Sequence, residues 1–277
     1  MLFRDNQSSL ASFILMRDLR KMKISIITAT WNSAVTIENA ILSVASQGYP
    51  DLEHIVVDGN SSDATLPIIF RHADRIDKLI SEPDHGIYDA MNKGISVATG
   101  DVIGILNSDD FYAHPHVLKK VARVFEDESI HTCYGDLVYV DPANVSRITR
   151  YWRSGNHTPR NFYQGWMPPH PTFFVRRSVY EKYGNFNLSL GTAADYELTL
   201  RLLLKYGVST TYIPEVLVHM RAGGASNASL KSRLATVRMA NLSWQVNNLK
   251  PLPWTLTFRL LSKLIQYTRM RDVVMPA

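Results

Sequence analysis

The first 110 residues alternate between short apolar runs and longer stretches in which apolar residues recur every three or four positions. The short runs predict buried strands, and the longer period predicts amphipathic helices between them. The expected strands are 23–30, 54–58, 78–81 and 102–106. Ser33 is placed to cap the first helix, and 87–97 predicts a later one. Four alternations of strand and helix predict a parallel, doubly wound α/β sheet.

The second half of the sequence has a more mixed pattern. Strands are expected at 131–140 and 147–152 and as a pair within about 209–221. Between them, 153–171 predicts a long loop that contains Gly, Pro, His and Trp. After Gly223-Gly224 the composition changes to a basic helical pattern. The regions that follow from this are an N-terminal extension 1–22, an α/β domain 23–225 and a helical tail 226–277.

Charge is unevenly distributed along the 277 residues, whose net charge is +5. The tail carries +7, the first 23 residues carry +3 and the middle carries −5. An acidic body with a basic tail argues against a core that binds nucleic acid. The single cysteine, Cys133, excludes a disulfide framework and a Cys-based zinc site and indicates a reducing compartment. No apolar run approaches the ~20 residues of a membrane span and no signal peptide is recognisable, so we expect a cytoplasmic protein.

Polar residues follow the expected strands at the edge where parallel α/β sheets bind their ligands. These residues are Thr30, Asp58, Asp84, Asp109 and Asp110. Turn chemistry explains each of them singly but explains the whole set poorly. Adjacent carboxylates such as Asp109 and Asp110 suit a hard divalent cation that bridges to phosphates, and a solvated turn is the alternative. The chain has no Gly-x-Gly-x-x-Gly, no Gly-x-x-x-x-Gly-Lys-Ser/Thr and no Gly-x-Ser-x-Gly, which disfavours dinucleotide sites, P-loops and α/β hydrolases.

Four segments carry a closer resemblance. They are ISIITATWNSAVTIENAILSVASQ (24–47), HIVVDGNSSDAT (54–65), EPDHGIYDAMNKGISVATGDVIGILNSDD (82–110) and GTAADYELTLRLLLKYG (191–207). In this order the chain resembles family 2 glycosyltransferases with the GT-A fold, a Rossmann-like, mostly parallel sheet flanked by helices. The resemblance implies transfer of a sugar from a nucleotide diphosphate-sugar, with a UDP-sugar favoured, to a glycan or lipid-linked glycan in exopolysaccharide or lipopolysaccharide synthesis. It also implies Mn²⁺ or Mg²⁺ as cofactor, a nucleotide-binding half at 23–110 and an acceptor half at 111–225.

The resemblance assigns donor contacts to one group of residues. By position these are Thr28, Ala29, Thr30, Asp58, Asp84, Asn92, Lys93 and Asn107. The first strand would line the nucleobase pocket, and Asp58 would contact the base. Asn107 replaces the first acid of the family's Asp-x-Asp motif and would contact the ribose. Two of these residues have local alternatives, since Asp58 suits helix capping and Lys93 suits an exposed helix cation.

Metal binding and catalysis fall on other residues. The resemblance implies that Asp109 binds the cation, with Asp110 and His219 as further candidates. A lone His on a strand is more often structural. Asp195 holds the position of the catalytic base, which takes the proton of the acceptor hydroxyl as that hydroxyl attacks the sugar. Its place at the start of a helix also suits an N-cap.

Trp166 and His170 lie in the long loop and are candidates for acceptor stacking and hydrogen bonding, with loop packing as the alternative. The chain lacks the Gln-x-x-Arg-Trp motif and the membrane spans of processive synthases, so we expect one sugar to be added per acceptor. Two other functions stay open. A sugar nucleotidyltransferase usually has a Gly-rich phosphate loop after its first strand, which is missing here. A non-catalytic binding module is disfavoured because Asp58, Asp109 and Asp195 are all present.

The tail has an amphipathic pattern from 254 to 272. One helical face holds Trp254, Phe258, Leu261 and Ile265, and another gathers Lys and Arg. This pattern predicts a helix in a membrane interface, where each Lys or Arg near an anionic leaflet contributes about 1 kcal/mol. The alternative is that the apolar face packs on the catalytic domain or on a partner subunit. The oligomeric state stays open.

Overall fold

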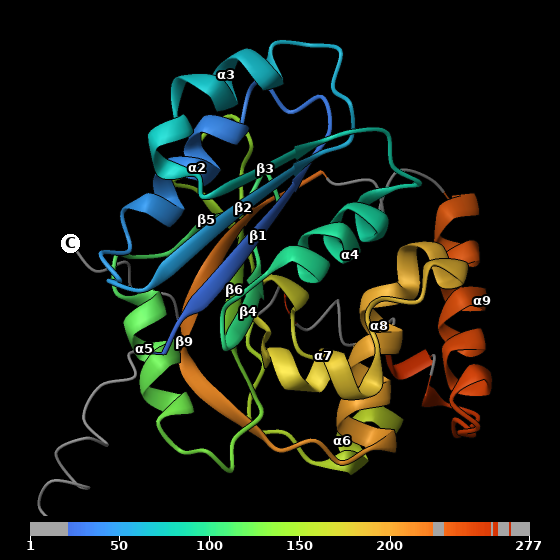
Figure 1. The fold of residues 1–277 in the computed structure, drawn as a ribbon. Coiled ribbons are helices and arrows are strands. Elements are labelled where there is room, and N and C mark those ends of the chain that lie inside the picture. Colours follow the sequence, from blue (N-terminus) through green and yellow to red (C-terminus); the bar gives the residue numbers. More distant parts are fainter. Residues whose placement is uncertain (1–21, 224–229, 256, 260–265, 267–277) are drawn as a thin grey trace, which may run out of the picture.

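The computed structural model describes residues 22–223, 230–255, 257–259 and 266 (Figure 1). In this part of the chain one sheet has the order β3-β2-β1-β4-β8-β6-β9-β5, with β7 paired to β6. The strands are β1 (Ile24–Thr30), β2 (Leu52–Asp58), β3 (Lys78–Ser81), β4 (Val102–Ile105), β5 (Phe111–Tyr112), β6 (Thr132–Val140), β7 (Ile148–Trp152), β8 (Phe174–Arg176) and β9 (Thr210–Arg221). The helices are α2 (Ile37–Ala45), α3 (Thr65–Arg71), α4 (Ile87–Val97), α5 (Val117–Phe125), α6 (Pro159–Tyr163), α7 (Arg177–Tyr183), α8 (Ala194–Thr199) and α9 (Leu230–Val246). Short helical turns are η1 (Ala73–Arg75), η2 (His170–Thr172), η3 (Leu188–Ala193) and the π-helical η4 (Leu200–Lys205).

The four strands predicted in the first half are confirmed to within two residues. β1 pairs in parallel with β2 on one side and with β4 on the other. All seven residues of β1 are buried, as expected for a central strand that is covered on both faces. The register aligns Thr30 with Asp58, so the strand ends meet at the same edge. The predicted extension 1–22 lies, apart from Met22, outside the described residues.

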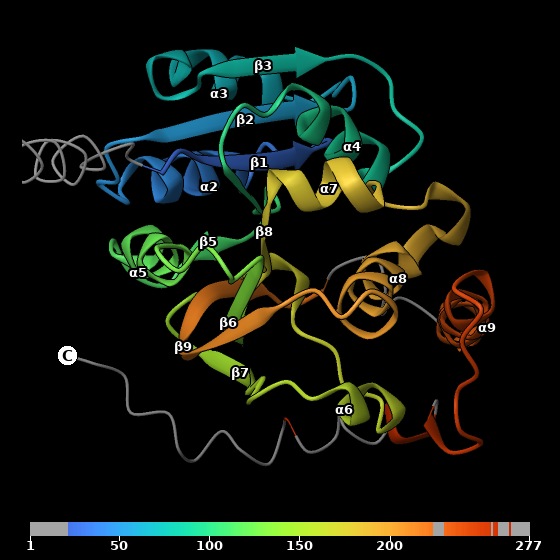
Figure 2. The same cartoon turned by 60° about the horizontal axis from the view of Figure 1, so that its bottom comes forward.

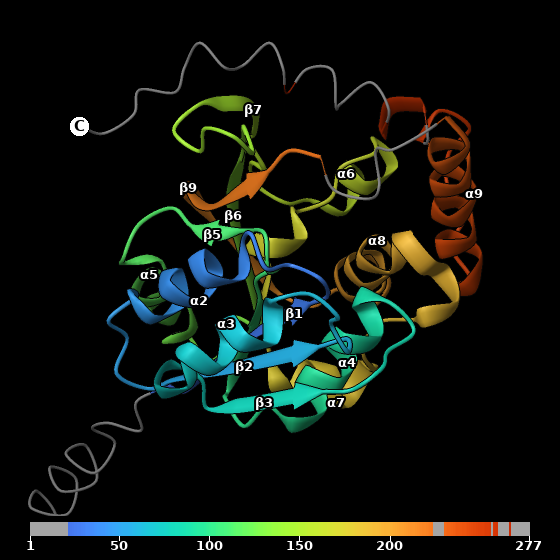
Figure 3. The same cartoon turned by 90° about the horizontal axis from the view of Figure 1, so that it is seen from above.

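Helices cover both faces of this half-sheet (Figure 3). Successive side chains on a strand point to opposite faces. Ile55 therefore joins the cluster under α4, whereas Val56 joins the cluster under α2 and α3. The helix α4 approaches β1 so closely that a Cβ on Gly94 would lie 2.4 Å from Ile27 Cγ2. The predicted α/β sheet with flanking helices is confirmed.

The second half of the sheet is mixed in direction. β8 runs antiparallel to β4, β6 and β7 form an antiparallel pair, and β6 and β9 pair in parallel. β6 and β7 are antiparallel because only a short connection, 141–147, joins them, and a parallel crossover needs a dozen or more residues. The parallel order predicted from the first half ends at β4, since the next strand in the sheet, β8, is antiparallel.

β9 is one continuous strand where the sequence pattern predicts a pair. It pairs with β6 along its length and with β5 near its end. The register against β6 shifts on both sides of Asp136, and Pro214 lies opposite this shift. Proline has no N–H to donate to the ladder, so the hydrogen bonding must be interrupted there. The predicted strand pair is wrong because this irregularity looks like a turn in the sequence.

The helix α9, which the sequence places in the tail 226–277, packs against α8 at the edge of the molecule (Figure 2). Trp244 on α9 is fully buried, and its Nε1 donates to the hydroxyl of Tyr196 on α8 at 2.9 Å. The next segment also contacts the domain, since the Arg259 guanidinium lies 3.9 Å from the centre of the Tyr196 ring. Trp254 and Phe258 remain 50% and 44% exposed.

The amphipathic helix predicted for 254–272 lies mostly outside the described residues. Its proposed apolar face at Leu261 and Ile265 therefore stays a prediction. None of the helices in the described ranges has the length and apolar character needed to cross a bilayer.

Candidate active site

The loops that follow β1, β2 and β4 are tied together at the carboxyl edge of the sheet. Asn32 adopts a left-handed conformation with φ of 49°, and its Oδ1 accepts a hydrogen bond from Ser62 N at 2.9 Å. The predicted capping role of Ser33 is wrong, because an additional turn delays the start of α2 to Ile37. The Ser33 hydroxyl lies instead 2.9 Å from Ser108 Oγ in the loop after β4. These hydrogen bonds hold the loops after the three strands together at one edge of the sheet.

The residues predicted to line a nucleobase pocket lie at the carboxyl end of β1. Thr28 Oγ1 lies 3.1 Å from Nε2 of the buried His54, whose pKa burial lowers to about 4. Ala29 is buried, and the Thr30 hydroxyl is buried without a partner in the described part of the chain. Trp31, which the sequence analysis did not select, follows directly and is 66% exposed. An exposed indole at a ligand-binding edge offers a stacking face, and its position after the strand end was the available signal.

Asp58 and Asp84 both lie at the turn that follows β2. Asp58 is fully buried and accepts hydrogen bonds from Ser61 Oγ at 2.5 Å and from Ser81 Oγ at 2.8 Å. It closes the turn after β2 and makes no cap to α3. Asp84 reaches the same place, since a Cβ on Gly59 would lie 2.4 Å from Asp84 Oδ2. Only glycine permits this approach, which brings Asp84 against the residue that follows Asp58.

Asn92 and Lys93 on α4 hold neighbouring loops. The Asn92 amide donates to Phe186 O at 2.9 Å and accepts from Phe186 N at 3.0 Å. Lys93 Nζ pairs with Glu82 Oε1 at 2.8 Å. This hydrogen bond, with the charge of Asp84 as a further cause, raises the pKa of Lys93. The structure therefore keeps Lys93 beside Asp84 and directs Asn92 away from it, toward the loop that precedes α8.

The predicted metal carboxylates follow β4. Asp110 is fully buried, and its Oδ2 accepts a hydrogen bond from Asn107 Nδ2 at 3.0 Å. Burial, followed by the charge of Asp109, raises the pKa of Asp110 well above its usual range. Burial also raises the pKa of Asp109. The Arg221 guanidinium opposes both shifts through its charge, and it donates to the backbone carbonyl of Asp109.

Three buried oxygen atoms at these strand ends have no hydrogen-bond partner among the described residues. They are Thr30 Oγ1, Asn107 Oδ1 and Asp110 Oδ1. Buried acceptors are normally satisfied, and an oxygen-rich set with carboxylates is what a hard divalent cation prefers. The residues thus fit such a cation. In the described ranges no three His, Cys, Asp or Glu residues are arranged to hold a metal, so further ligands such as phosphate oxygens would be needed.

His219 lies on β9 opposite Phe111, the residue that follows Asp110. It pairs with Phe111 of β5, and the two rings meet edge to face with centroids 5.1 Å apart. Burial lowers the pKa of His219, and the charge that adds to this effect belongs to His114. The Phe111 ring occupies one side of His219, and the role of His219 as a metal ligand stays a prediction.

Asp195 lies in the first turn of α8, next to the Tyr88 hydroxyl. The N-cap of that helix is Ala193, but Asp195 Oδ1 accepts a hydrogen bond from Tyr196 N at 2.7 Å, so the carboxylate does bond an amide of the first helical turn. Burial lowers the pKa of His170, whereas the charges of Asp195 and Asp109 both raise it. His170 Nε2 also lies 3.5 Å from Asn107 Nδ2. The charges of the two carboxylates that were predicted separately as metal ligand and base thus both act on His170.

Tyr88 on α4 is a further residue of this site. Burial raises the pKa of the Tyr88 hydroxyl well above its usual range, and the neighbouring Asp195 carboxylate adds to the shift. The Tyr88 ring packs at 5.2 Å from the ring of Phe186. A hydroxyl beside Asp195 can orient that carboxylate. No sequence signal marks Tyr88, because only the fold brings α4 and α8 together.

Trp166 belongs to an aromatic cluster in the long loop. Its indole N–H donates to Ser154 O at 2.7 Å, and its ring stacks on His157 with centroids 5.0 Å apart. Tyr134 meets it edge-on at 5.6 Å. These contacts match the loop-packing alternative, so the structure does not bring Trp166 into the group around His170.

An α/β sheet with carboxylates at its ligand-binding edge is the arrangement that the sequence resemblance implies, and the comparison with protein families agrees. Residues 25–184 match the profile of Glycosyl transferase family 2, so the chain belongs to this family and is a glycosyltransferase. A relative described as "PGL/p-HBAD biosynthesis glycosyltransferase" in Mycobacterium bovis (strain BCG / Pasteur 1173P2) is 31% identical over 209 residues. The match covers 73% of this chain and 78% of the relative.

Solved structures confirm the predicted GT-A architecture. The fragment 1–349 of Staphylococcus aureus TarS has a TM-score of 0.63 at 20% identity over 90% of this chain and 73% of the fragment. The match to another structure of TarS covers 44% of that chain. The mannosyltransferase PcManGT from Pyrobaculum calidifontis, solved with GDP-Man and Mn²⁺, has a TM-score of 0.61 at 17% identity and is covered over 84% of its length. At these identities the likeness concerns the fold.

We predict that Asn107→Asp destabilises the protein and makes its stability depend on divalent metal. The new carboxylate would face buried Asp110, and two such groups about 3 Å apart cannot both ionise cheaply. In EDTA the melting temperature should fall by roughly 5 °C. Mn²⁺ should raise it more than it raises the wild-type value. Asn144→Asp, at an exposed turn, is the control and should change neither value. Equal metal effects on Asn107→Asp and wild type would contradict a cation site here.

Proposed function

We propose that this chain is an inverting, metal-dependent, non-processive glycosyltransferase. It would transfer one sugar from a nucleotide diphosphate-sugar to a glycan or lipid-linked glycan during the synthesis of a cell-surface polysaccharide. The observation that carries the proposal is that His170, whose Nε2 lies 3.5 Å from Asn107 Nδ2, is acted on by the charges of both Asp109 and Asp195. One of these carboxylates suits the donor's metal and the other suits a base.

The donor would bind across the ends of β1, β2 and β4. Trp31 offers a face for the nucleobase, the backbone of Thr28, Ala29 and Thr30 lines the pocket, and Asp58 and Asp84 lie at its base-recognising side. Asn107 would meet the ribose. TarS is solved with UDP and with UDP-GlcNAc, and PcManGT with GDP-Man, which supports a nucleotide-sugar donor of this kind. A UDP-sugar is the favoured donor.

Mn²⁺ or Mg²⁺ would be held by Asp109, with Asp110 and the Asn107 amide oxygen behind it. The unpartnered oxygens support this assignment, as does the Mn²⁺ in PcManGT. When bound, such a cation neutralises charge on the leaving diphosphate. His219 stays a further candidate ligand, with the Phe111 ring on one side of it.

Asp195 would accept the proton of the acceptor hydroxyl while that oxygen attacks the anomeric carbon. The bond between this carbon and the diphosphate oxygen breaks as the new glycosidic bond forms, and the configuration inverts. Burial lowers the pKa of His170, so the ring is neutral near pH 7 and can hydrogen-bond the acceptor hydroxyl. The Tyr88 hydroxyl would keep the Asp195 carboxylate directed at the same point.

The test is release of nucleotide diphosphate from a panel of UDP- and GDP-sugars with Mn²⁺, Mg²⁺ or EDTA. We expect turnover with one nucleotide class, only with a divalent cation, and faster turnover when a glycan acceptor is added. Full activity in EDTA would contradict the metal role. Formation of a nucleotide-sugar from a nucleoside triphosphate and a sugar phosphate would identify a nucleotidyltransferase. Binding without turnover would identify a binding module.

We predict that Asp195→Asn retains metal-dependent binding of the nucleotide diphosphate but loses nearly all transfer. Loss of a general base typically costs ~10²–10⁴-fold in rate, and the donor contacts lie on other elements. Calorimetric binding and initial rates measure the two effects separately. Asp74→Asn, at an exposed acid, is the matched control and should behave as wild type. More than about a tenth of wild-type turnover in Asp195→Asn would exclude its role as the base.

We further propose that the tail holds the enzyme on an anionic membrane face on the cytoplasmic side, where lipid-linked acceptors reside. Trp254 and Phe258 are about half exposed, at the start of the predicted amphipathic stretch. Trp254→Ser/Phe258→Ser should reduce co-flotation with anionic liposomes several-fold, because burial of an aromatic side chain is worth ~1.5–3 kcal/mol. Val35→Ser/Phe70→Ser, also exposed, is the control. Equal flotation of the two variants would mean that the tail only packs on protein.

A further inference from the structure

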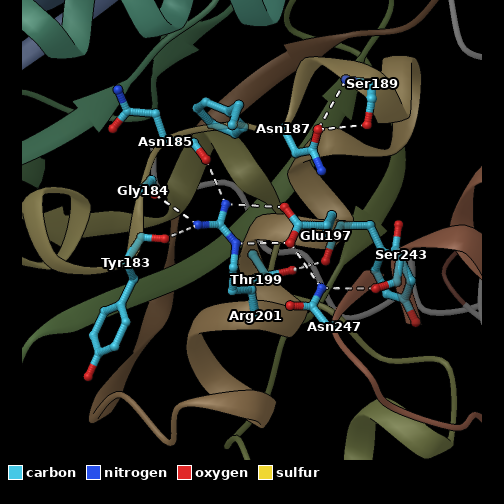
Figure 4. Close-up of polar contacts among 12 residues, drawn as sticks. Tyr183, Gly184, Asn185, Asn187, Ser189, Glu197, Thr199, Arg201, Ser243 and Asn247 are labelled. Atoms are coloured by element: carbon cyan, nitrogen blue, oxygen red, sulfur yellow. Dashed lines mark hydrogen bonds and ion pairs between the residues drawn. The ribbon is translucent and has the colours of Figure 1, made fainter. Parts of the chain in front are cut away.

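A short loop between α7 and η3 is held by one arginine of the helix that follows it. Arg201 lies on η4, directly after α8, and its guanidinium points back to this loop (Figure 4). It donates to the carbonyl oxygens of Tyr183, Gly184 and Asn185, the last two at 3.0 Å and 2.6 Å. From the other side, the Asn92 amide makes two hydrogen bonds to the backbone of Phe186, the next residue. Four successive backbone positions are therefore fixed.

Glu197 on α8 completes the bonding of this guanidinium. Its two oxygens accept from Arg201 Nε at 2.9 Å and from Arg201 Nη2 at 3.2 Å, and the two side chains are 3% and 12% exposed. Each of the five N–H groups of Arg201 thus has an acceptor. Asn247, just after α9, is 3% exposed and donates to Glu197 Oε1 at 2.9 Å and to Ser243 O at 2.9 Å. The network ties α8, η4, α9 and the loop into one unit.

This unit surrounds the short stretch of chain that carries Asp195. The next residue, Tyr196, is bonded to Trp244 of α9, and the one after it is Glu197. On the other side, Phe186 of the fixed loop packs on Tyr88, whose hydroxyl lies beside Asp195. The carboxylate is thus supported through its own helix and through its hydroxyl neighbour.

Stability alone is a weak reason for such a network. A buried ion pair is often no more stabilising than apolar residues of the same volume, because both charges lose their hydration. A fully bonded planar guanidinium does fix directions closely. A catalytic group must be held within about 0.5 Å of its working position, and a displacement of about 1 Å can cost ~10²-fold in rate.

We propose that Glu197, Arg201 and Asn247 are positioning residues for Asp195. The Glu197–Arg201 pair fixes the orientation of α8 relative to the loop between α7 and η3. Asn247 makes that orientation depend on the packing of α9. The C-terminal helix therefore serves the transfer reaction itself. This inference rests on the proposed role of Asp195 as the base.

The test compares two variants of the network with a buried acid elsewhere. Glu197→Gln places an amide N–H donor opposite the N–H donors of the Arg201 guanidinium. Asn247→Ala removes one hydrogen bond to Glu197. The control is Glu53→Gln at the opposite end of β2, where Glu53 is 2% exposed and accepts from Ser25 Oγ at 2.5 Å and Thr99 N at 2.8 Å. Thermal unfolding, kcat, and Kd for UDP with Mn²⁺ are measured on each full-length protein. The kcat values are taken with the donor selected by the nucleotide-sugar panel, well below each melting temperature.

We expect kcat to fall about 10- to 100-fold in Glu197→Gln and less in Asn247→Ala, while the Kd for UDP changes less than about twofold. Glu53→Gln should lose stability and keep its kcat. The proposal is overturned if Glu197→Gln keeps its kcat within about twofold, or if its nucleotide affinity falls together with kcat. Should Glu197→Gln fail to fold, Asn247→Ala decides by the same two measurements. Asp195→Asn is assayed alongside, because high turnover in that variant would reject the base itself rather than its positioning.

Discussion

β1 is paired in parallel on both sides, and the arrangement of the site depends on this pairing. The register sets Thr30 beside Asp58, and β4 follows the same direction on the other side. Three loops consequently leave the sheet at one edge, where hydrogen bonds between Asn32, Ser33 and their neighbours hold them together. A slip of one residue in this register would turn the polar strand ends to the opposite face. Recognition of a donor along several strand ends is possible because the backbone has already aligned them.

The buried carboxylates of this protein fall into two groups. Glu53 and Asp136 are satisfied by the protein: Asp136 accepts from the Tyr151 and Tyr212 hydroxyls at 2.6 Å and 2.8 Å, and hydrogen bonds outweigh burial to hold the pKa of Glu53 at about 2. At the carboxyl edge the balance is reversed, since burial raises the pKa of Asp109 and Asp110. The chain thus satisfies Glu53 and Asp136 internally, whereas Asp110 keeps one oxygen without a partner among the described residues, as expected where a cation and a diphosphate are to bind.

The sequence predicts the first half of the fold well, because continuous apolar runs and the polar residues that end them are local signals. The second half is harder, since the irregular pairing of β9 around Pro214 becomes visible only against β6. The same limit applies to the site. A strand position cannot tell whether His219 faces a carboxylate or Phe111, and a Trp in a long loop looks alike whether it binds a ligand or packs, as Trp166 does. Tyr88 and the burial of Trp244 depend on contacts between distant segments. The roles of the predicted site residues stay predictions, although the charges of Asp109 and Asp195 both act on His170.

The central claim is that Asp195 activates an acceptor hydroxyl opposite the departing nucleotide diphosphate. The most direct measurement is the anomeric configuration of the product, read by proton NMR while the wild-type enzyme transfers sugar from its preferred nucleotide-sugar. The account predicts that the first linkage formed has the configuration opposite to that of the sugar in the donor. A linkage that forms from the start with the donor's own configuration would contradict it, because a single base-assisted displacement cannot retain the configuration at that carbon.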